Sequence, residues 1–98
     1  MKYVGNGFSF QMVKDIYGTL KSCELSEKDF CSQTEDAISI IGHPDLANII
    51  GKDYNRQSIC LQKGDILYVV QITGGRLPEG ATKIPPNCKL KYIEIKYR

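Results

Sequence analysis

The residues of this chain best suited to chemistry are a histidine, an arginine and a glutamate. His43 lies between an apolar run and a proline, whereas Arg76 and Glu79 share the glycine-rich segment 74–80. Arginine holds a phosphate with a fixed fork of N–H donors, histidine exchanges protons near neutral pH, and a glutamate can orient the arginine or accept a hydroxyl proton. Together they could cleave an RNA-like phosphodiester without a metal: a 2′-hydroxyl attacks phosphorus, arginine stabilises the added charge, and histidine protonates the departing 5′ oxygen.

Further polar candidates lie in predicted turns. Asn6 and Ser9 belong to the N-terminal glycine turn, and Asn55 and Arg56 precede an apolar run. Such side chains, together with the backbone N–H groups of a glycine turn, can hold phosphates or base edges.

Each candidate also has a simpler structural interpretation. His43 could be only a helix cap, Arg76 and Glu79 an exposed ion pair, Asn6 a turn residue and Arg56 a solvated cation. The residues alone therefore indicate an anion-binding domain that could support acid–base chemistry, and no more.

The segment around the histidine predicts where its side chain is presented. Residues 37–41 form an apolar, strand-like run, Pro44 suits the first position of a helix, and Gly51 suits its end. We expect a helix over residues 44–50 with His43 as its N-cap, at a strand-to-helix junction.

The remaining patterns predict short strands and helices. We expect strands at 2–4 and 19–25, a helix within 8–16, and a second helix from Ser26 to about Gln33.

The C-terminal half is richer in strand signals. A turn at 62–65 predicts a hairpin of 57–61 with 66–73, and the apolar run 67–70 predicts a central strand covered on both faces. Lysines alternate with apolar residues over 89–97, which favours a strand at a protected sheet edge.

These elements predict one α/β domain over residues 1–98. Its mixed sheet should have about five strands, with short helices mainly on one face. A chain of 98 residues builds only a modest core, and homodimer formation would add buried area.

Composition narrows the function classes. The net charge of +2 is too small for a nonspecific duplex binder, and no apolar run is long enough to span a membrane. Four cysteines without a C-x-x-C pair, beside a single histidine, make a zinc site improbable. We expect free thiols in a reducing cytosol, buried within the fold, and no signal peptide.

The chain resembles the small viral anti-CRISPR ring nucleases, proteins of archaeal viruses, phages and mobile elements that degrade cyclic tetra-adenylate. The resemblance spans nearly the whole chain in the family's order. It rests on YVGNGFSFQM (3–12), DFC (29–31), IGH (41–43), NR (55–56), LYVVQI (67–72), RLPEG (76–80) and YIEI (92–95).

The resemblance implies a homodimer with the ligand across its two-fold axis, no metal or other cofactor, and linear products with 2′,3′-cyclic phosphate ends. It implies that His43 is the general acid and that Arg76 and Glu79 lie at the scissile phosphate. The implied ligand-binding residues are Asn6, Ser9, Gln11 and Arg56, with Gln11 matching only loosely.

Two departures bear on this resemblance. Members usually continue Gly-His with Asp/Glu-Ser-Thr, whereas this chain has Pro44-Asp45-Leu46, and Pro44 lacks a backbone N–H donor. The stretch after Gly80 is also shorter, and residues 83–87 do not favour the helix that members typically have there.

Three functions therefore stay open. The first is a ring nuclease that acts in the host cytoplasm to suppress antiviral signalling. The second is a sponge that binds a cyclic nucleotide without cutting it. The third is a nucleic-acid-binding or adaptor dimer, indicated only by the lysines of the last strand, although we expect neither duplex binding nor membrane contact.

Overall fold

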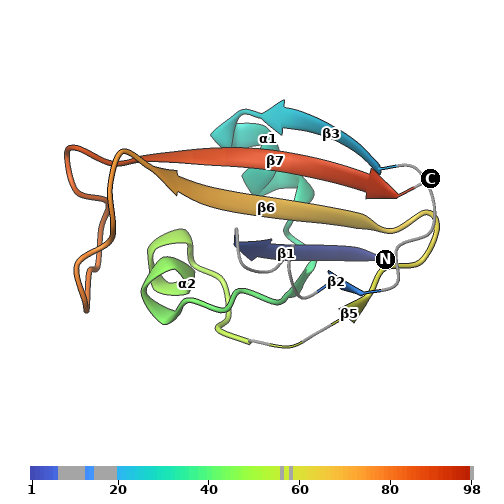
Figure 1. The fold of residues 1–98 in the computed structure, drawn as a ribbon, viewed down its shortest axis with the longest axis horizontal. Coiled ribbons are helices and arrows are strands. Elements are labelled where there is room, and N and C mark those ends of the chain that lie inside the picture. The colour runs from blue at the N-terminus through green and yellow to red at the C-terminus, as the bar shows by residue number, and fades with distance from the viewer. Residues whose placement is uncertain (7–12, 15–19, 56, 58, 98) are drawn as a thin grey trace.

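The computed structural model describes residues 1–6, 13–14, 20–55, 57 and 59–97, arranged around one main sheet (Figure 1). The helices are α1 (Glu27–Gln33) and α2 (Pro44–Ile50). The main sheet has the order β3-β7-β6-β1-β4, and β2 and β5 form a separate two-stranded sheet. The strands are β1 (Lys2–Asn6), β2 (Val13–Lys14), β3 (Leu20–Leu25), β4 (Ile38–Ser39), β5 (Ile59–Cys60), β6 (Ile66–Thr73) and β7 (Lys89–Tyr97).

Strand β6 is the centre of the main sheet. It pairs in parallel with β1 and antiparallel with β7, and β1 and β7 pair in turn with β4 and β3. Its residues 67–70 are all buried, so side chains on both of its faces are covered. The predicted mixed sheet of five strands and its covered central strand are confirmed.

The two faces of the sheet carry separate apolar clusters. Phe30 of α1 and Leu46 of α2 pack with Tyr68, Val70 and other residues of one face. Ile40 and Leu61 pack with Leu67, Val69 and Tyr97 on the opposite face. Successive residues of a strand point to opposite faces, which explains how neighbouring β6 residues serve both clusters. Both helices therefore cover the same face, as predicted.

Helix α1 begins at the predicted cap residue, and the carbonyl groups at its C-terminal end accept hydrogen bonds from two lysines elsewhere in the chain. The Ser26 hydroxyl accepts a hydrogen bond from the Asp29 N–H at 3.2 Å. At its other end, Lys2 Nζ donates to the Gln33 carbonyl at 3.3 Å and Lys52 Nζ to the Thr34 carbonyl at 3.0 Å. Cations are favourable at a helix C-terminus, and these two join α1 to β1 and to the end of α2.

The predicted hairpin of residues 57–61 with 66–73 is wrong. The turn itself forms, since the Asp65 N–H donates to the Gln62 carbonyl at 2.9 Å and the Asp65 carboxylate accepts from the Gln62 N–H at 2.9 Å. However, β5 pairs with β2, because β1 and β7 already occupy both edges of β6.

The last strand has its predicted bounds but not its predicted place. Strand β7 lies inside the sheet, since β3 pairs along its outer edge from Leu20 to Leu25. Its Glu94 is 8% exposed, and the carboxylate lies 3.5 Å from Lys96 Nζ and accepts from Cys23 Sγ at 3.7 Å. The lysines of β7 therefore lie at positions whose side chains reach solvent, although the strand itself is paired on both sides.

The helix predicted within residues 8–16 is contradicted at Val13 and Lys14, which form β2. Pairing with β5 outweighs the helical spacing of the apolar residues there. The rest of that segment lies outside the described residues. Helices α1 and α2 have seven residues each, and no helix in the described part of the chain is long and apolar enough to cross a bilayer.

Of the three cysteines whose side chains the structure describes, two are exposed and not buried as predicted. Cys23 and Cys31 are free thiols on exposed residues, whereas Cys88 is free and buried. Cys23 lies on the edge strand β3 and Cys31 on the outer side of α1, where neither position needs an apolar side chain for the core.

Candidate active site

His43 occupies the predicted place at the start of α2. It is the N-cap residue, with Pro44 as the first helical residue, and Gly51 ends the helix in the left-handed conformation at φ 71°. The half-buried imidazole accepts a hydrogen bond through Nδ1 from the Leu46 N–H at 3.2 Å. The ring therefore serves as the cap acceptor that serine or aspartate usually supplies.

The position of the imidazole is fixed by the core beneath α2. Leu46 and Ala47 are buried against the sheet, at 3% and 2% exposure. Before the helix, Ile41 forms a parallel bridge with Tyr54, and the Asn55 side chain donates to the Ser39 carbonyl at 3.2 Å. His43 thus lies between residues 39–41, which are held by hydrogen bonds, and helix α2, which is held by packing on the sheet.

The segment joining β6 to β7 carries Arg76 and Glu79. Its base is narrow because Gly74, at φ 90°, lies so close to the Asn87 carbonyl that a Cβ would collide with it. Hydrogen bonds from the Ala81 N–H to the Pro78 carbonyl and from the Cys88 N–H to the Pro85 carbonyl close two turns within it. No helix forms over residues 74–88, all of which are described.

Two contacts hold this loop against α2. The Asp45 carboxylate accepts a hydrogen bond from the Gly80 N–H at 3.0 Å. Leu77 packs on the apolar cluster that contains Leu46. Arg76 comes directly before Leu77 and Glu79 directly before Gly80, so the loop is fixed at the same end of the molecule as His43.

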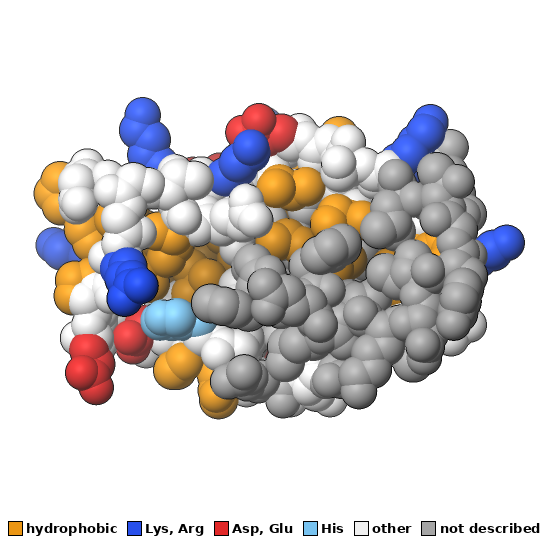
Figure 2. Space-filling view, viewed as in Figure 1, with side chains coloured by type: hydrophobic (Ala, Val, Ile, Leu, Met, Phe, Trp, Pro, Cys, Tyr) orange, Lys and Arg blue, Asp and Glu red, His pale blue; other side chains and the backbone are white. Residues whose placement is uncertain are grey.

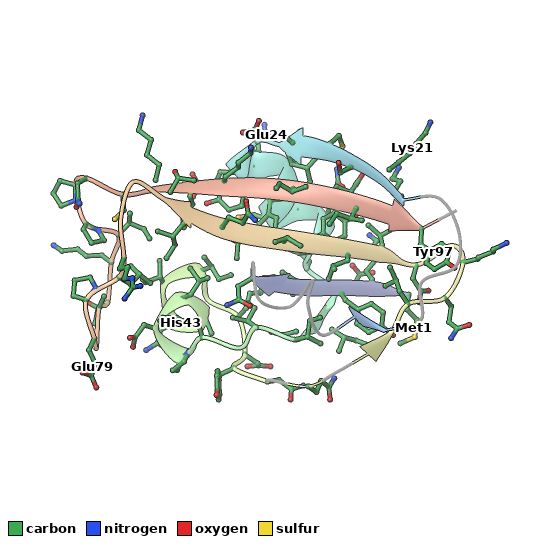
Figure 3. The ribbon with its side chains drawn as sticks, in the orientation of Figure 1. Met1, Lys21, Glu24, His43, Glu79 and Tyr97 are labelled. Carbon is green, nitrogen blue, oxygen red and sulfur yellow. The ribbon has the colours of Figure 1, made fainter. Side chains whose placement is uncertain are left out.

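Figures 2 and 3 show this end of the molecule. Basic and acidic side chains gather around the only histidine in the space-filling view. In the stick view, Glu79 lies at the loop tip and its side chain points away from His43. Within one chain, the fold therefore brings the loop beside the histidine but does not direct the glutamate at the ring.

The other predicted ligand-binding residues are only partly described. Asn6 is the last residue of β1, and at 4% exposure it is buried in the strand and does not lie in an open turn. Asn55, which precedes Arg56, is held beside the strand that leads to His43. Ser9, Gln11 and Arg56 lie outside the described residues.

Sequence reasoning missed the role of Asp45. It noted this residue only as part of a departure from the family pattern, whereas its carboxylate joins the helix to the loop. An acidic residue in the first turn of a helix is common for electrostatic reasons, so nothing in the sequence distinguished it.

A hollow of about 370 Å³ lies elsewhere, at the start of β1 and β6. Lys2 and Asp36 line it, and Lys2 Nζ lies 3.6 Å from Asp36 Oδ1. Met1, which also lines it, is at the opposite end of the molecule from His43 in Figure 3. This hollow is separate from the candidate site.

Within the described residues, no group of three or more histidine, cysteine, aspartate or glutamate side chains could hold a metal ion. The side chains of His43, Arg76 and Glu79 are of types that form hydrogen bonds, stabilise charge and exchange protons.

The fold and this site define a small α/β protein with a mixed sheet and a histidine beside a charged loop. Among solved structures, B116 of Sulfolobus turreted icosahedral virus (STIV) is similar, with a TM-score of 0.76, 23% sequence identity and coverage of 98% of each chain. The family model described as STIV B116-like matches residues 2–95. The chain belongs to the STIV B116-like family. No curated protein matches it.

Proposed function

We propose that this protein is a metal-independent ring nuclease, which binds a cyclic oligoadenylate messenger and opens it, with cyclic tetra-adenylate as the first candidate. The proposal is carried by one observation: the first turn of α2 holds both His43 and the loop with Arg76 and Glu79. The imidazole accepts a hydrogen bond from this turn through Nδ1. Asp45, in the same turn, accepts a hydrogen bond from Gly80 of the loop. Membership of the STIV B116-like family and the sequence resemblance to ring nucleases support it.

The proposed reaction is an internal transesterification. A ribose 2′-hydroxyl attacks the adjacent phosphorus, the bond to the 5′ oxygen breaks, and a linear product with a 2′,3′-cyclic phosphate results. Arg76 would stabilise the negative charge on the phosphoryl oxygens, and His43 would donate a proton to the departing 5′ oxygen. Glu79 would orient the arginine or receive the hydroxyl proton.

The proposal includes a homodimer. A symmetric ring is matched by two identical sites related by a two-fold axis, and one chain of 98 residues is small for enclosing four nucleotides. Since Glu79 points away from His43 of its own chain, we propose that it acts beside His43 of the partner subunit.

The proposed setting is immune evasion by a virus or mobile element. B116 is a protein of a virus, and the ring nucleases that the sequence resembles degrade a host messenger. On this proposal the protein acts in the host cytoplasm, where that messenger is made.

Mass spectrometry with a panel of cyclic oligonucleotides tests this function. The purified protein, at micromolar concentration and with a chelator present, should convert cyclic tetra-adenylate into linear products carrying cyclic phosphate ends. Recovery of the intact ring after hours would contradict cleavage of that substrate, and the other members of the panel would then decide whether a different ring is cut.

The variant His43→Ala separates binding from turnover. It should abolish turnover while leaving most of the ring affinity, because the phosphate contacts of arginine and backbone groups remain. Turnover by this variant at the wild-type rate would exclude the proposed role of the histidine. Its thermal unfolding should be compared with wild type, since the ring also caps α2.

A sponge is the second candidate function. Residues 81–88 contain no helix that could cover a ligand, and Pro44 removes one N–H donor next to His43. If the protein binds a ring tightly and releases it intact on denaturation, the sponge is supported. Turnover of more than one ring per dimer would exclude it.

A further inference from the structure

Tyr54 is an exposed aromatic residue beside the segment that leads to His43. It is 54% exposed, whereas every other aromatic residue that the structure describes is buried or half-buried. Its ring contacts no other described aromatic ring, and its hydroxyl forms no hydrogen bond with another described residue. Both the apolar body and the polar end of this side chain are therefore available to a ligand.

The backbone that carries Tyr54 is held by several bonds to residues 39–41. Tyr54 forms a parallel bridge with Ile41, and the Asn55 N–H donates to the Ile41 carbonyl at 3.1 Å. The Asn55 side chain donates to the Ser39 carbonyl at 3.2 Å, and the Ser39 hydroxyl donates to the Asp53 carbonyl. Bonds on both sides of Tyr54 thus fix the point from which its ring extends. An aromatic side chain on a fixed backbone loses little conformational entropy when it binds a ligand.

The bridge to Ile41 also sets how far Tyr54 lies from the histidine. His43 follows Ile41 by two residues, and its backbone is extended, with φ −127° and ψ 112°. Two extended residues along one segment and one step across to its neighbour give a Cα separation of roughly 8 Å between Tyr54 and His43. In a nucleotide, the base lies at a comparable distance from the phosphate. The tyrosine is therefore within reach of the base of a nucleotide whose phosphate meets His43.

We infer that a base of the cyclic nucleotide stacks on Tyr54, next to the phosphate that meets His43. This inference rests on the proposed function and adds a base contact to the groups that hold the phosphate. Every nucleobase has a π-face, so stacking on an aromatic side chain contributes affinity without reading a pattern of hydrogen bonds. Because a purine presents a larger face than a pyrimidine, this contact favours an adenylate ring over a uridylate ring of the same size.

Ring binding to Tyr54 variants tests the stacking contact. Isothermal titration calorimetry in the His43→Ala background, which should leave the ring whole, gives the affinity. Tyr54→Ala should weaken binding of cyclic tetra-adenylate by roughly 5–150-fold, whereas Tyr54→Phe keeps the aromatic face and should retain most of the affinity. Ile38→Ala is the matched control, because it removes another exposed apolar side chain, at 38% exposure, from the separate hollow. It should leave the affinity unchanged.

Exchanging the base identifies the part of the ligand that the tyrosine contacts. With Tyr54 present, cyclic tetra-adenylate should bind more tightly than cyclic tetra-uridylate. Tyr54→Ala should reduce this preference, because two groups in contact show coupled effects when both are changed. A preference of the same size in both proteins would place the base elsewhere and overturn the inference.

Fluorescence gives a direct reading at this position. The chain contains no tryptophan, so Tyr54→Trp supplies the only indole emission. Stacking of an adenine should quench this emission in step with the binding that calorimetry measures. Binding of the ring without quenching would show that no base lies on the side chain.

The outcomes separate the stacking contact from the proposed function. If Tyr54→Ala binds the ring as tightly as its parent, stacking is rejected and ring binding stands. If native mass spectrometry shows that Tyr54→Ala loses affinity because its dimer dissociates, Tyr54 belongs to the subunit interface and stacking is again rejected. Failure of every ring in the panel to bind either protein would reject the proposed function, and this inference with it.

Discussion

At the scale of single residues, the helix cap and the loop tether are local bonds with separate consequences. His43 caps α2 through Nδ1, and Asp45 holds Gly80 through its carboxylate. His43 and Asp45 lie on either side of Pro44, in the first turn of α2. This one turn therefore fixes the position of the imidazole and the position of the charged loop. Substitutions here should change function more than stability, because the loop residues Glu79 and Gly80 are exposed.

Asp45→Ala should release the loop. We expect faster hydrogen exchange over residues 76–82 and a lower kcat/KM on any ring that the protein cleaves. The stability loss should stay at or below about 1 kcal/mol, because the lost hydrogen bond is exposed. Hydrogen-exchange mass spectrometry measures the first effect.

The matched control for Asp45→Ala is Glu35→Ala. It removes the same charge from an exposed residue in the turn after α1 and should leave the loop unchanged. Unaltered exchange in Asp45→Ala would mean that the Gly80 bond does not hold the loop.

Tyr68 should make the protein sensitive to alkaline pH. Burial, followed by the nearby Glu94 carboxylate, raises its pKa to about 12 from the usual 10.0. The folded state therefore keeps this proton more tightly than the unfolded state, so its contribution is complete below pH 10 and is lost as pH rises toward 12. The loss should approach about 2 kcal/mol.

Tyr68→Phe isolates this effect. At pH 7 it should be less stable than wild type by about 1 kcal/mol, since the hydroxyl donates to Gln33 Oε1 at 3.1 Å. Urea unfolding at a series of pH values should show this gap closing or reversing between pH 10 and 12. A gap that stays constant over that range would contradict the raised pKa.

At the scale of elements, the base of the loop between β6 and β7 depends on glycine. Gly74→Ala adds a Cβ into the Asn87 carbonyl and also places alanine at φ 90°. Gly64, in the turn before β6, has nearly the same φ of 94° but open space around its Cβ position. Comparing the two positions separates steric collision from backbone strain.

Urea unfolding should rank the two alanine variants. Gly64→Ala should lower the free energy of unfolding by about 1 kcal/mol, because of the left-handed backbone alone. Gly74→Ala should lower it further, by about 1–3 kcal/mol, and it should impair ligand binding because the loop base must move. Equal losses would show that the loop base shifts to accommodate the Cβ without a measurable loss of stability.

Elements specified by neighbouring residues were predicted well from the sequence. The cap at His43, the proline after it and Gly51 lie within one short segment, so local chemistry determines α2. The prediction of a hairpin was wrong because strand pairing depends on distant parts of the chain. Strands β1 and β7 occupy the two edges of β6, which leaves no edge for β5. For the same reason the sequence could nominate Arg76 and Glu79 but could not reveal the Asp45–Gly80 bond.

At the scale of the whole molecule, our proposal requires two chains to complete each site. His43 and the charged loop share one end of the molecule, while the Glu79 side chain points away from the ring. Completion by a partner subunit makes a prediction that no single-chain site shares: defects in different residues should complement each other.

Mixing two inactive variants tests completion across the dimer. After unfolding and refolding together, His43→Ala and Glu79→Ala chains should form about half mixed dimers, each with one intact site made from both chains. About a quarter of wild-type activity should therefore return. No recovery, with mixed dimers verified by native mass spectrometry, would place both residues of a site in the same chain.

The most direct test of the account is a single-turnover reaction of labelled cyclic tetra-adenylate with excess wild-type protein and no divalent metal. The account predicts disappearance of the ring and formation of linear oligoadenylate with a 2′,3′-cyclic phosphate, both absent with His43→Ala. A ring that binds and stays whole, or that opens equally fast without the histidine, would contradict it.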